Sequence, residues 1–267
     1  MEDLGFLIDI FERVDVFLLI LVRLIGFFVI LPILSGANIP AMIRMSFSVG
    51  FAFMVYVSGL YVDHSFWNDS ILGFFWLVVG EFFIGFTMAY VVYIVFSLLY
   101  LVGQFMDDSI GFNMVSVMDP ASQIQVPVIG NLLYLMAMVM LVIGGGLNRL
   151  LFALFGSFQV APIGINFFAN EALPMYVIGL IVTTFYMGLQ IAMPVVGALL
   201  AINISLGLLV KTVPQMNIFA VGIPLRMFLG LIILFVVIPV FGTVFTRVFE
   251  IAYNAVIDVI LALGAGQ

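Results

Sequence analysis

The sequence predicts an all-α membrane protein with about six long, partly kinked helices. Of its 267 residues, 66% are hydrophobic and only 8% are charged, whereas a soluble domain has about 25% charged and 45–50% apolar residues. Such a chain has too little polar surface to cover a water-soluble particle of its size. Its apolar residues also form continuous runs, whereas strands of a membrane barrel alternate apolar and polar residues. These observations exclude a soluble enzyme, a secreted domain and a disordered chain.

Six apolar runs are candidates to cross a bilayer, for which a helix needs about 20 residues. They cover residues 16–34, 45–61, 71–102, 128–147, 174–209 and 227–246. At about 1.5 Å per residue, residues 71–102 would extend ~48 Å and residues 174–209 ~54 Å, against a hydrocarbon core of ~30 Å. The excess must bend or leave the bilayer under an apolar cover, which we expect to be protein, from this chain or from partner subunits.

The C-terminal stretch 247–263 predicts an amphipathic helix of a different kind. Its polar residues recur at helical spacing and form one narrow stripe: Arg247, Glu250, Asn254 and Asp258. The cations between the runs predict no orientation, because three fall on each predicted side of the membrane. This balance is a second indication that partners, and not lipid alone, form the environment of the chain.

Several classes of chemistry are excluded by residue counts and missing motifs. The chain has no Cys and a single His, His64, so thiolate and multi-histidine metal sites are excluded. Its net charge of −7 is opposite to that of a nucleic-acid-binding protein. No phosphate-binding loop, nucleophile elbow or zinc-protease motif occurs. We therefore expect no enzymatic activity, no cofactor and no metal.

Arg23 and Glu81 are the strongly ionisable residues placed well inside apolar runs. A charge at the centre of a membrane helix costs about 2.5–3.5 kcal/mol even on the lenient insertion scale. Each residue should therefore be paired or face water. A proton or ion relay is one interpretation; a structural ion pair, with each other or with a neighbouring subunit, is favoured, because a relay usually needs several titratable groups in series.

Residues 103–127 interrupt the apolar pattern and predict a loop. Gly, Asp, Asn, Ser and Pro are frequent there, as in turns. Asp107, Asp108 and Asp119 do not have the spacing of a calcium loop, so a solvated loop is favoured over a cation site. The loop also carries adaptable apolar side chains. These side chains are compatible with two alternatives: a plug that closes a pore, or a surface loop whose apolar residues pack on the helices.

Pro194 and Asn203 lie within the long run 174–209. A proline removes one backbone hydrogen bond and kinks a helix. Broken helices mark substrate sites in some transporters, but a bend that lets a long helix curve around its neighbour is favoured. Farther on, Pro214 and Gly222 are expected to break the helical pattern between residues 211 and 224.

Several segments, in order along the chain, carry a resemblance to a known family. They are Leu21-Val22-Arg23-Leu24, Leu31-Pro32-Ile33-Leu34, Ile39-Pro40, Gly80-Glu81 with Gly85, Gly103-Gln104 with Asp107, Gly111-Phe112, Asp119-Pro120, Gly156-Ser157-Phe158, Pro162-Ile163-Gly164, Asn203 with Leu206-Gly207-Leu208, Val213-Pro214-Gln215-Met216-Asn217 and Gly222-Ile223-Pro224-Leu225. Together they resemble the FliR family, the flagellar export-gate subunit whose injectisome counterpart is SctT. Lys211, where the family has Arg, and Leu147-Asn148-Arg149, where many relatives have a His-containing turn, depart from the pattern.

The resemblance implies a subunit that assembles with FliP-like and FliQ-like membrane subunits and associates with an FlhB-like subunit in the bacterial inner membrane, at the flagellar basal body. Exported flagellar proteins would pass unfolded through the closed conduit of this complex. Residues 1–170 would form a FliP-like helical part that includes the gate loop 103–127. Residues 171–267 would form a FliQ-like helical hairpin with the amphipathic C-terminal helix.

The resemblance also favours the plug interpretation, because the family's loop at this position faces the conduit. The gate residues would be Gly111, Phe112, Asn113, Met114, Val117 and Met118. Helix breaks and assembly would involve Pro194, Asn203, Pro214, Gln215 and Asn217. The alternative function is a stand-alone secondary transporter or ion channel, against which stand the missing inverted repeat and the few polar groups within the runs.

Overall fold

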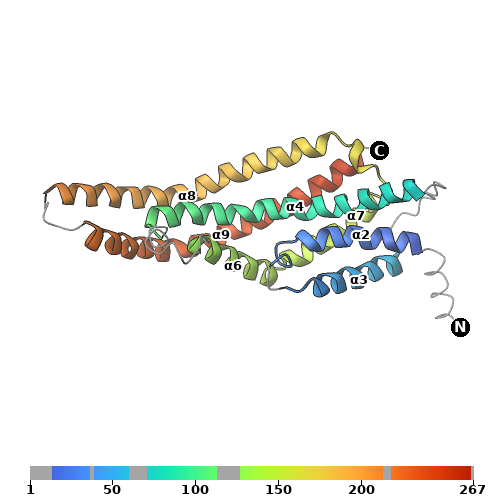
Figure 1. Cartoon of the computed structure of the whole chain (residues 1–267), viewed down its shortest axis with the longest axis horizontal. Helices are drawn as coiled ribbons and strands as arrows, with labels where there is room; N and C mark the ends of the chain where they lie inside the picture. The colour runs from blue at the N-terminus through green and yellow to red at the C-terminus, as the bar shows by residue number, and fades with distance from the viewer. Residues whose placement is uncertain (1–13, 37–38, 60–70, 113–126, 213–217, 266–267) are drawn as a thin grey trace. The chain divides into compact units, whose positions relative to one another are not determined.

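The structure, a computed structural model, describes residues 14–36, 39–59, 71–112, 127–212 and 218–265. These residues form seven α-helices and one short 3₁₀ helix, without a strand among them, which confirms the predicted all-α class. The elements are α2 (Val14–Ile30), α3 (Ala41–Ser58), α4 (Ile71–Ile110), α6 (Val128–Ile143), α7 (Gly146–Val160), η2 (Phe167–Ala169), α8 (Ala172–Thr212) and α9 (Ile218–Ala265) (Figure 1).

Four of the described helices are long and apolar enough to cross a membrane, or five if one bent pair counts as a span. The four segments are Ala41–Ser58, Ile71–Ile110, Ala172–Leu209 and Val221–Ala265. Helix α2 has 17 residues and is marginal, because a spanning helix needs about 20. The predicted run 128–147 is divided, since α6 and α7 meet at an angle of 69°. Gly145 lies at this break with a φ of 70°, a conformation that glycine adopts without strain.

Two predicted boundaries are wrong because helices continue through residues that often end them. Helix α4 runs past residue 102 to Ile110 and has 40 residues. Helix α9 has 48 residues and contains both Pro224 and Pro239. The stretch 247–263 is therefore the end of α9 and not a separate helix, and Gly222 does not break the chain there. Pro224 and Pro239 are both exposed, and each removes one backbone hydrogen bond; the helix keeps its other bonds, because a backbone in apolar surroundings has no water to bind instead.

The chain divides into two compact units. The first contains residues 1–95, 145–180 and 251–267, and the second contains residues 96–144 and 181–250. Helices α4, α8 and α9 each contribute residues to both units. The predicted division at residue 170 rests on likeness to FliP and FliQ and not on internal contacts, and it stays a prediction.

In the first unit, glycines allow α2 and α4 to approach closely. A Cβ atom at Gly85 would collide with the backbone carbonyl of Arg23, and one at Gly26 would collide with the carbonyl of Phe82. Small residues at helix crossings are typical of membrane proteins, where close backbone packing replaces the hydrophobic effect. Helix α2 also packs on α3, where the rings of Phe28 and Phe51 lie 5.4 Å apart.

In the second unit, the C-terminal part of α4 contacts three other helices. A Cβ atom at Gly103 would collide with the backbone at Gly130 of α6. One at Gly188 of α8 would lie 2.9 Å from the side chain of Leu101, and one at Gly230 of α9 would lie 2.7 Å from Ile110. The last turns of α4 are therefore enclosed by helices that come from distant parts of the sequence.

The long helices differ in how much apolar surface they bury. In the most apolar 18-residue stretch of α4, 67% is buried, compared with 22% in the corresponding stretch of each of α3, α8 and α9. On α9, Phe235 is 78% exposed and Val236 is 68% exposed. Apolar patches of this extent require lipid or another protein as cover.

We predict that Gly85→Ala destabilises the protein strongly. The added methyl group meets backbone, which cannot turn away, so α2 and α4 must separate; overpacking typically costs about 1–3 kcal/mol. The measurement is the thermal midpoint of the protein co-expressed and solubilised in detergent together with its expected partner subunits, followed by fluorescence-detected size exclusion. Gly50→Ala is the matched control, because a Cβ atom there meets nothing within 4 Å. Equal midpoints for the two variants would show that the helices do not cross closely at Gly85.

Candidate functional site

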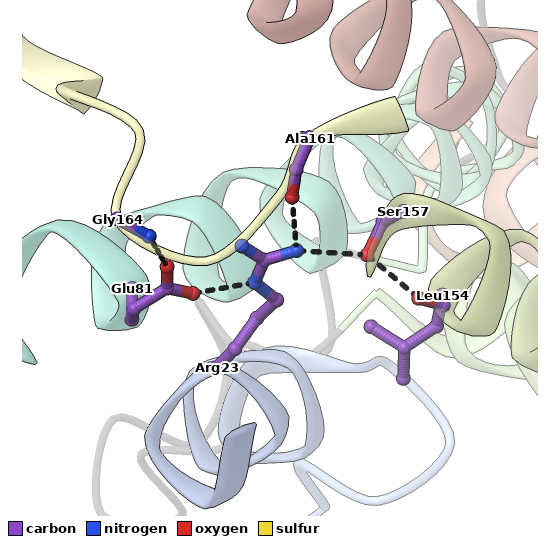
Figure 2. A network of polar contacts seen from close by, with 6 residues as sticks. All are labelled: Arg23, Glu81, Leu154, Ser157, Ala161 and Gly164. Atoms are coloured by element: carbon purple, nitrogen blue, oxygen red, sulfur yellow. Dashed lines mark hydrogen bonds and ion pairs between the residues drawn. The ribbon is translucent and has the colours of Figure 1, made fainter. Parts of the chain in front are cut away.

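The first polar cluster is built on Arg23, which lies in α2, and Glu81, which lies in α4 (Figure 2). Arg23 is 0% exposed and Glu81 is 1% exposed. The Arg23 Nε donates a hydrogen bond of 2.6 Å to Glu81 Oε2 and forms an ion pair with it. The sequence allowed pairing of Arg23 and Glu81 with each other or with a neighbouring subunit. In the structure the two side chains pair with each other.

The rest of the network ties this pair to α7 and to the turn that follows it. Arg23 Nη1 donates to the carbonyl oxygen of Ala161 at 2.9 Å and to Ser157 Oγ at 3.4 Å. Glu81 Oε1 accepts a hydrogen bond of 2.9 Å from the backbone N–H of Gly164. The guanidinium carbon of Arg23 also lies 4.4 Å from the ring centre of Phe158, a cation–π contact. One ion pair thus joins three segments that are far apart in the sequence.

The chemistry of this network favours a structural role over a relay. Beyond the pair, its partners are backbone groups and the hydroxyl of Ser157, which itself donates to the carbonyl oxygen of Leu154 at 2.6 Å (Figure 2). A relay would need further titratable groups in series, and the hydrogen bonds of Arg23, Glu81 and Ser157 lead to none among the described residues. Arg23 Nη2 is buried and makes no hydrogen bond to any residue that the structure describes.

Sequence reasoning did not identify the partners Ser157, Ala161 and Gly164. A signal was present, because Gly156-Ser157-Phe158 and Pro162-Ile163-Gly164 belong to the segments that resemble the FliR family. Two of these partners contribute backbone atoms, however, and a residue type does not reveal which backbone group accepts or donates a bond.

The gate residues lie only partly within the described structure. Gly111 and Phe112 follow α4, whereas Asn113, Met114, Val117, Met118 and Asp119 lie outside the described residues. The predicted loop bounds 103–127 are wrong at their start, because residues 103–110 are the last turns of α4. Gly103 serves there as a close helix contact with Gly130 and not as a hinge.

Asp107 also contradicts the expectation of a solvated loop. It lies in α4 and is 0% exposed. Its two carboxylate oxygens accept a hydrogen bond from the backbone N–H of Ile129, at 3.2 and 3.1 Å. A buried carboxylate needs such donors to offset the loss of hydration. Asp108, the next residue along the helix, is exposed as predicted.

Two of the five predicted assembly residues lie within the described structure, and three lie outside it. Pro194 and Asn203 lie within α8, which continues through the proline. Asn203 Oδ1 is buried and has no hydrogen-bond partner within the described segments. Pro214, Gln215 and Asn217 lie outside the described residues.

Comparison with known proteins assigns the family. The family model described as bacterial export proteins, family 1, matches residues 14–252. The chain belongs to this family. The matched residues include the Arg23–Glu81 pair and Asp107 near the end of α4.

The individual relatives confirm the predicted resemblance to the FliR family. The chain is 29% identical to the flagellar biosynthetic protein FliR of Bacillus subtilis over 97% of this chain and 98% of that protein. It is 26% identical to FliR of Escherichia coli K12 over 91% of this chain and 92% of the relative. The corresponding values for FliR of Aquifex aeolicus are 25%, 85% and 87%.

We predict that Arg23→Met and Glu81→Leu each reduce the amount of folded protein severely. Breaking a buried ion pair leaves one charge uncompensated and costs about 3–5 kcal/mol, whereas replacing both charges with apolar side chains is often nearly neutral. The double variant should therefore accumulate better than either single variant. The measurement is the membrane level of each variant by immunoblot, with Arg149→Met as the control, since Arg149 is exposed.

Additive losses in the double variant would mean that the two side chains do not interact. Normal accumulation of a single variant with selective loss of proton-driven export would favour the relay instead.

Proposed function

We propose that this chain is the FliR-type subunit of a flagellar protein export gate in the bacterial inner membrane, at the base of the flagellum. The observation that carries this proposal is the family match over residues 14–252. The relatives quoted above are flagellar biosynthetic proteins and align over nearly the whole chain. The apolar helices α4, α8 and α9 support a membrane location.

The proposed role is structural and not catalytic. The subunit forms, together with FliP-like and FliQ-like subunits, the wall of a closed conduit for unfolded flagellar proteins, and an FlhB-like subunit associates with the same assembly. The exposed apolar surfaces of α3, α8 and α9 support this proposal, because they need cover that the described part of the chain does not provide. Residues 1–170 and 171–267 are proposed to correspond to FliP-like and FliQ-like parts.

The alternative of a stand-alone transporter or channel has less support. Its main sequence features were Arg23, Glu81 and Pro194. The two charges bind each other, and α8 continues through Pro194. Neither feature therefore supplies an unpaired charge or a broken helix for a transported ion or substrate.

We predict that the chain has no stable monomeric state in detergent. Its exposed apolar helices need partner surfaces, so the chain should aggregate or be degraded when expressed alone. Co-expression with FliP-like and FliQ-like partners should yield one discrete complex. The measurement is size exclusion with light scattering on protein purified through a tag on this chain; a monodisperse species of 29.4 kDa would contradict the prediction.

We further propose that Gly111, Phe112 and the residues that follow, up to Met118, close the conduit at rest. Phe112, Met114, Val117 and Met118 are bulky and apolar, and an apolar constriction blocks ions because water leaves it. The glycine at position 111 has a φ of 97° and turns the chain sharply after α4. These features support a segment that begins at a defined point and carries a deformable seal.

We predict that replacing Phe112 and Met114 with glycine makes the assembled complex leak small ions without preventing assembly. The two substitutions remove apolar volume from the proposed seal while leaving the helices intact. The measurement is single-channel conductance of purified complexes in a planar bilayer. An exposed phenylalanine elsewhere supplies the control, Phe152→Gly in α7 (74% exposed). An assembled Phe112/Met114 variant that stays as tight as wild type would show that these residues are not the seal.

A further inference from the structure

We propose that the exposed face of α8 between Tyr186 and Leu208 docks one apolar helix of another membrane subunit. This helix crosses α8 closely at Gly197 and Ala201 and forms a hydrogen bond at Gln190. The inference rests on the proposed function, in which the export gate supplies such subunits, and it names the surface that binds one of them. All residues of this face lie in the second compact unit.

Two polar groups without partners lie together near the middle of α8. The side chain of Gln190 is exposed and forms no hydrogen bond with the residues that the structure describes. Pro194, which is also exposed, has no N–H, so the carbonyl of Gln190, four residues earlier, lacks its usual helix donor. Hydrocarbon offers such groups no partner, whereas a neighbouring helix can supply one. Gln190 therefore favours protein over lipid as the cover.

Small residues continue the same face toward the end of α8. Gly197, Ala201 and Ser205 are exposed and recur every four residues, which places them on one side of the helix. A Cβ atom at Gly197 would meet nothing within 4 Å, so no described contact of this chain requires glycine there. The Ser205 hydroxyl donates to the carbonyl oxygen of Ala201 at 2.9 Å. The row thus leaves the backbone of α8 open to close approach by another helix.

Large apolar side chains border this row of small residues. They recur every seven residues and each is more than half exposed: Tyr186, Met193 and Leu200. A ridge beside a shallow row is the shape into which the side chains of a second helix pack. From Tyr186 to Leu208 the face is ~33 Å long, at about 1.5 Å per residue, which is the length of one membrane helix.

Helix α9, in the same unit, exposes a face of different composition. Its exposed residues from 228 to 240 are all large and apolar or proline: Phe228, Leu231, Ile232, Phe235, Val236, Pro239 and Val240. Pro239 also leaves a carbonyl without its helix donor, but no exposed small or polar side chain accompanies it in this stretch. The two helices bury equal shares of their apolar stretches. Composition, and not the extent of exposure, therefore distinguishes the face of α8 as a helix-docking surface.

Photo-crosslinking tests this inference directly. The tagged chain is co-expressed with the FliP-like and FliQ-like subunits, each with a different tag, and benzoylphenylalanine is introduced at Met193 of α8 or, as the control, at Phe235 of α9. Both positions are exposed by more than 60%. We expect Met193 to form an adduct with one tagged partner subunit in clearly higher yield than Phe235. Equal yields at the two positions would contradict the inference, because the composition of α8 would then select no partner.

The identity of the adduct separates the remaining occupants. An adduct of Met193 with a differently tagged second copy of this chain would overturn the inference. Intact complexes in which Met193 gives no protein adduct would also overturn it, in favour of lipid, and both results would leave the proposed function standing. Failure of the chain to form any complex with those subunits would overturn the proposed function and this inference together.

Substitutions measure the two parts of the contact as the amount of partner recovered per tagged chain. We expect Gly197→Leu to lower this recovery about tenfold, because a bulky side chain blocks close approach of a helix. Gly242→Leu is the matched control, since Gly242 lies in α9 and a Cβ atom there also meets nothing within 4 Å. Equal recovery with the two variants would contradict close packing at Gly197. If Gly197→Leu lowers the level of the chain itself, the adduct at Met193, formed with Gly197 in place, decides.

Gln190→Leu should lower the recovery about three- to tenfold, which is the usual effect of one lost hydrogen bond between membrane helices. Gln159→Leu in α7 is its control, because it makes the same change at another exposed glutamine. Recovery with Gln190→Leu equal to that with Gln159→Leu would show that no partner binds Gln190.

Discussion

The first unit depends on one interaction, the buried ion pair between Arg23 and Glu81. Neither charge is tolerable alone within an apolar helix, where each would cost at least a few kcal/mol. Each is tolerated because Arg23 Nε lies 2.6 Å from Glu81 Oε2. Backbone groups also bind Arg23 Nη1 and Glu81 Oε1. The helices can bring the charges together only by crossing closely, and Gly85, which lies against the carbonyl of Arg23 itself, allows that crossing.

The second unit also uses a buried charge to join two helices. Among its described residues, Asp107 is the charged residue that is buried, and its carboxylate accepts a hydrogen bond at the start of α6. In a chain with 8% charged residues, these two buried clusters join segments distant in the sequence. The outer surfaces of α8 and α9 are left apolar. This distribution fits a subunit that uses its polar groups internally and offers apolar surface to lipid and partners.

The sequence predicts much of this architecture and misses specific parts for physical reasons. Composition and continuous apolar runs suffice for the helical membrane class, and the cost of a buried charge is enough to mark Arg23 and Glu81. The backbone partners Ala161 and Gly164 are not predictable, because every residue has the same backbone donors and acceptors. The end of α4 is misplaced because Gly103, Asp107 and Asp108 are typical of turns, while packing against Gly130 and the bond to Ile129 keep the helix intact. Helix α9 likewise continues through the exposed Pro224, because a proline removes one hydrogen bond and apolar surroundings offer the rest of the backbone no alternative partners.

The proposed function is tested most directly by measuring protein export in the bacterium that encodes this chain. The gene is deleted, and flagellar filament and hook proteins are measured in the growth medium and at the cell surface, with and without re-expression of the chain from a plasmid. If this chain is a subunit of the export gate, export and flagella are lost on deletion and return on re-expression. Normal export and normal flagella in the deletion strain, in the absence of a second homologous gene, would contradict the proposed function.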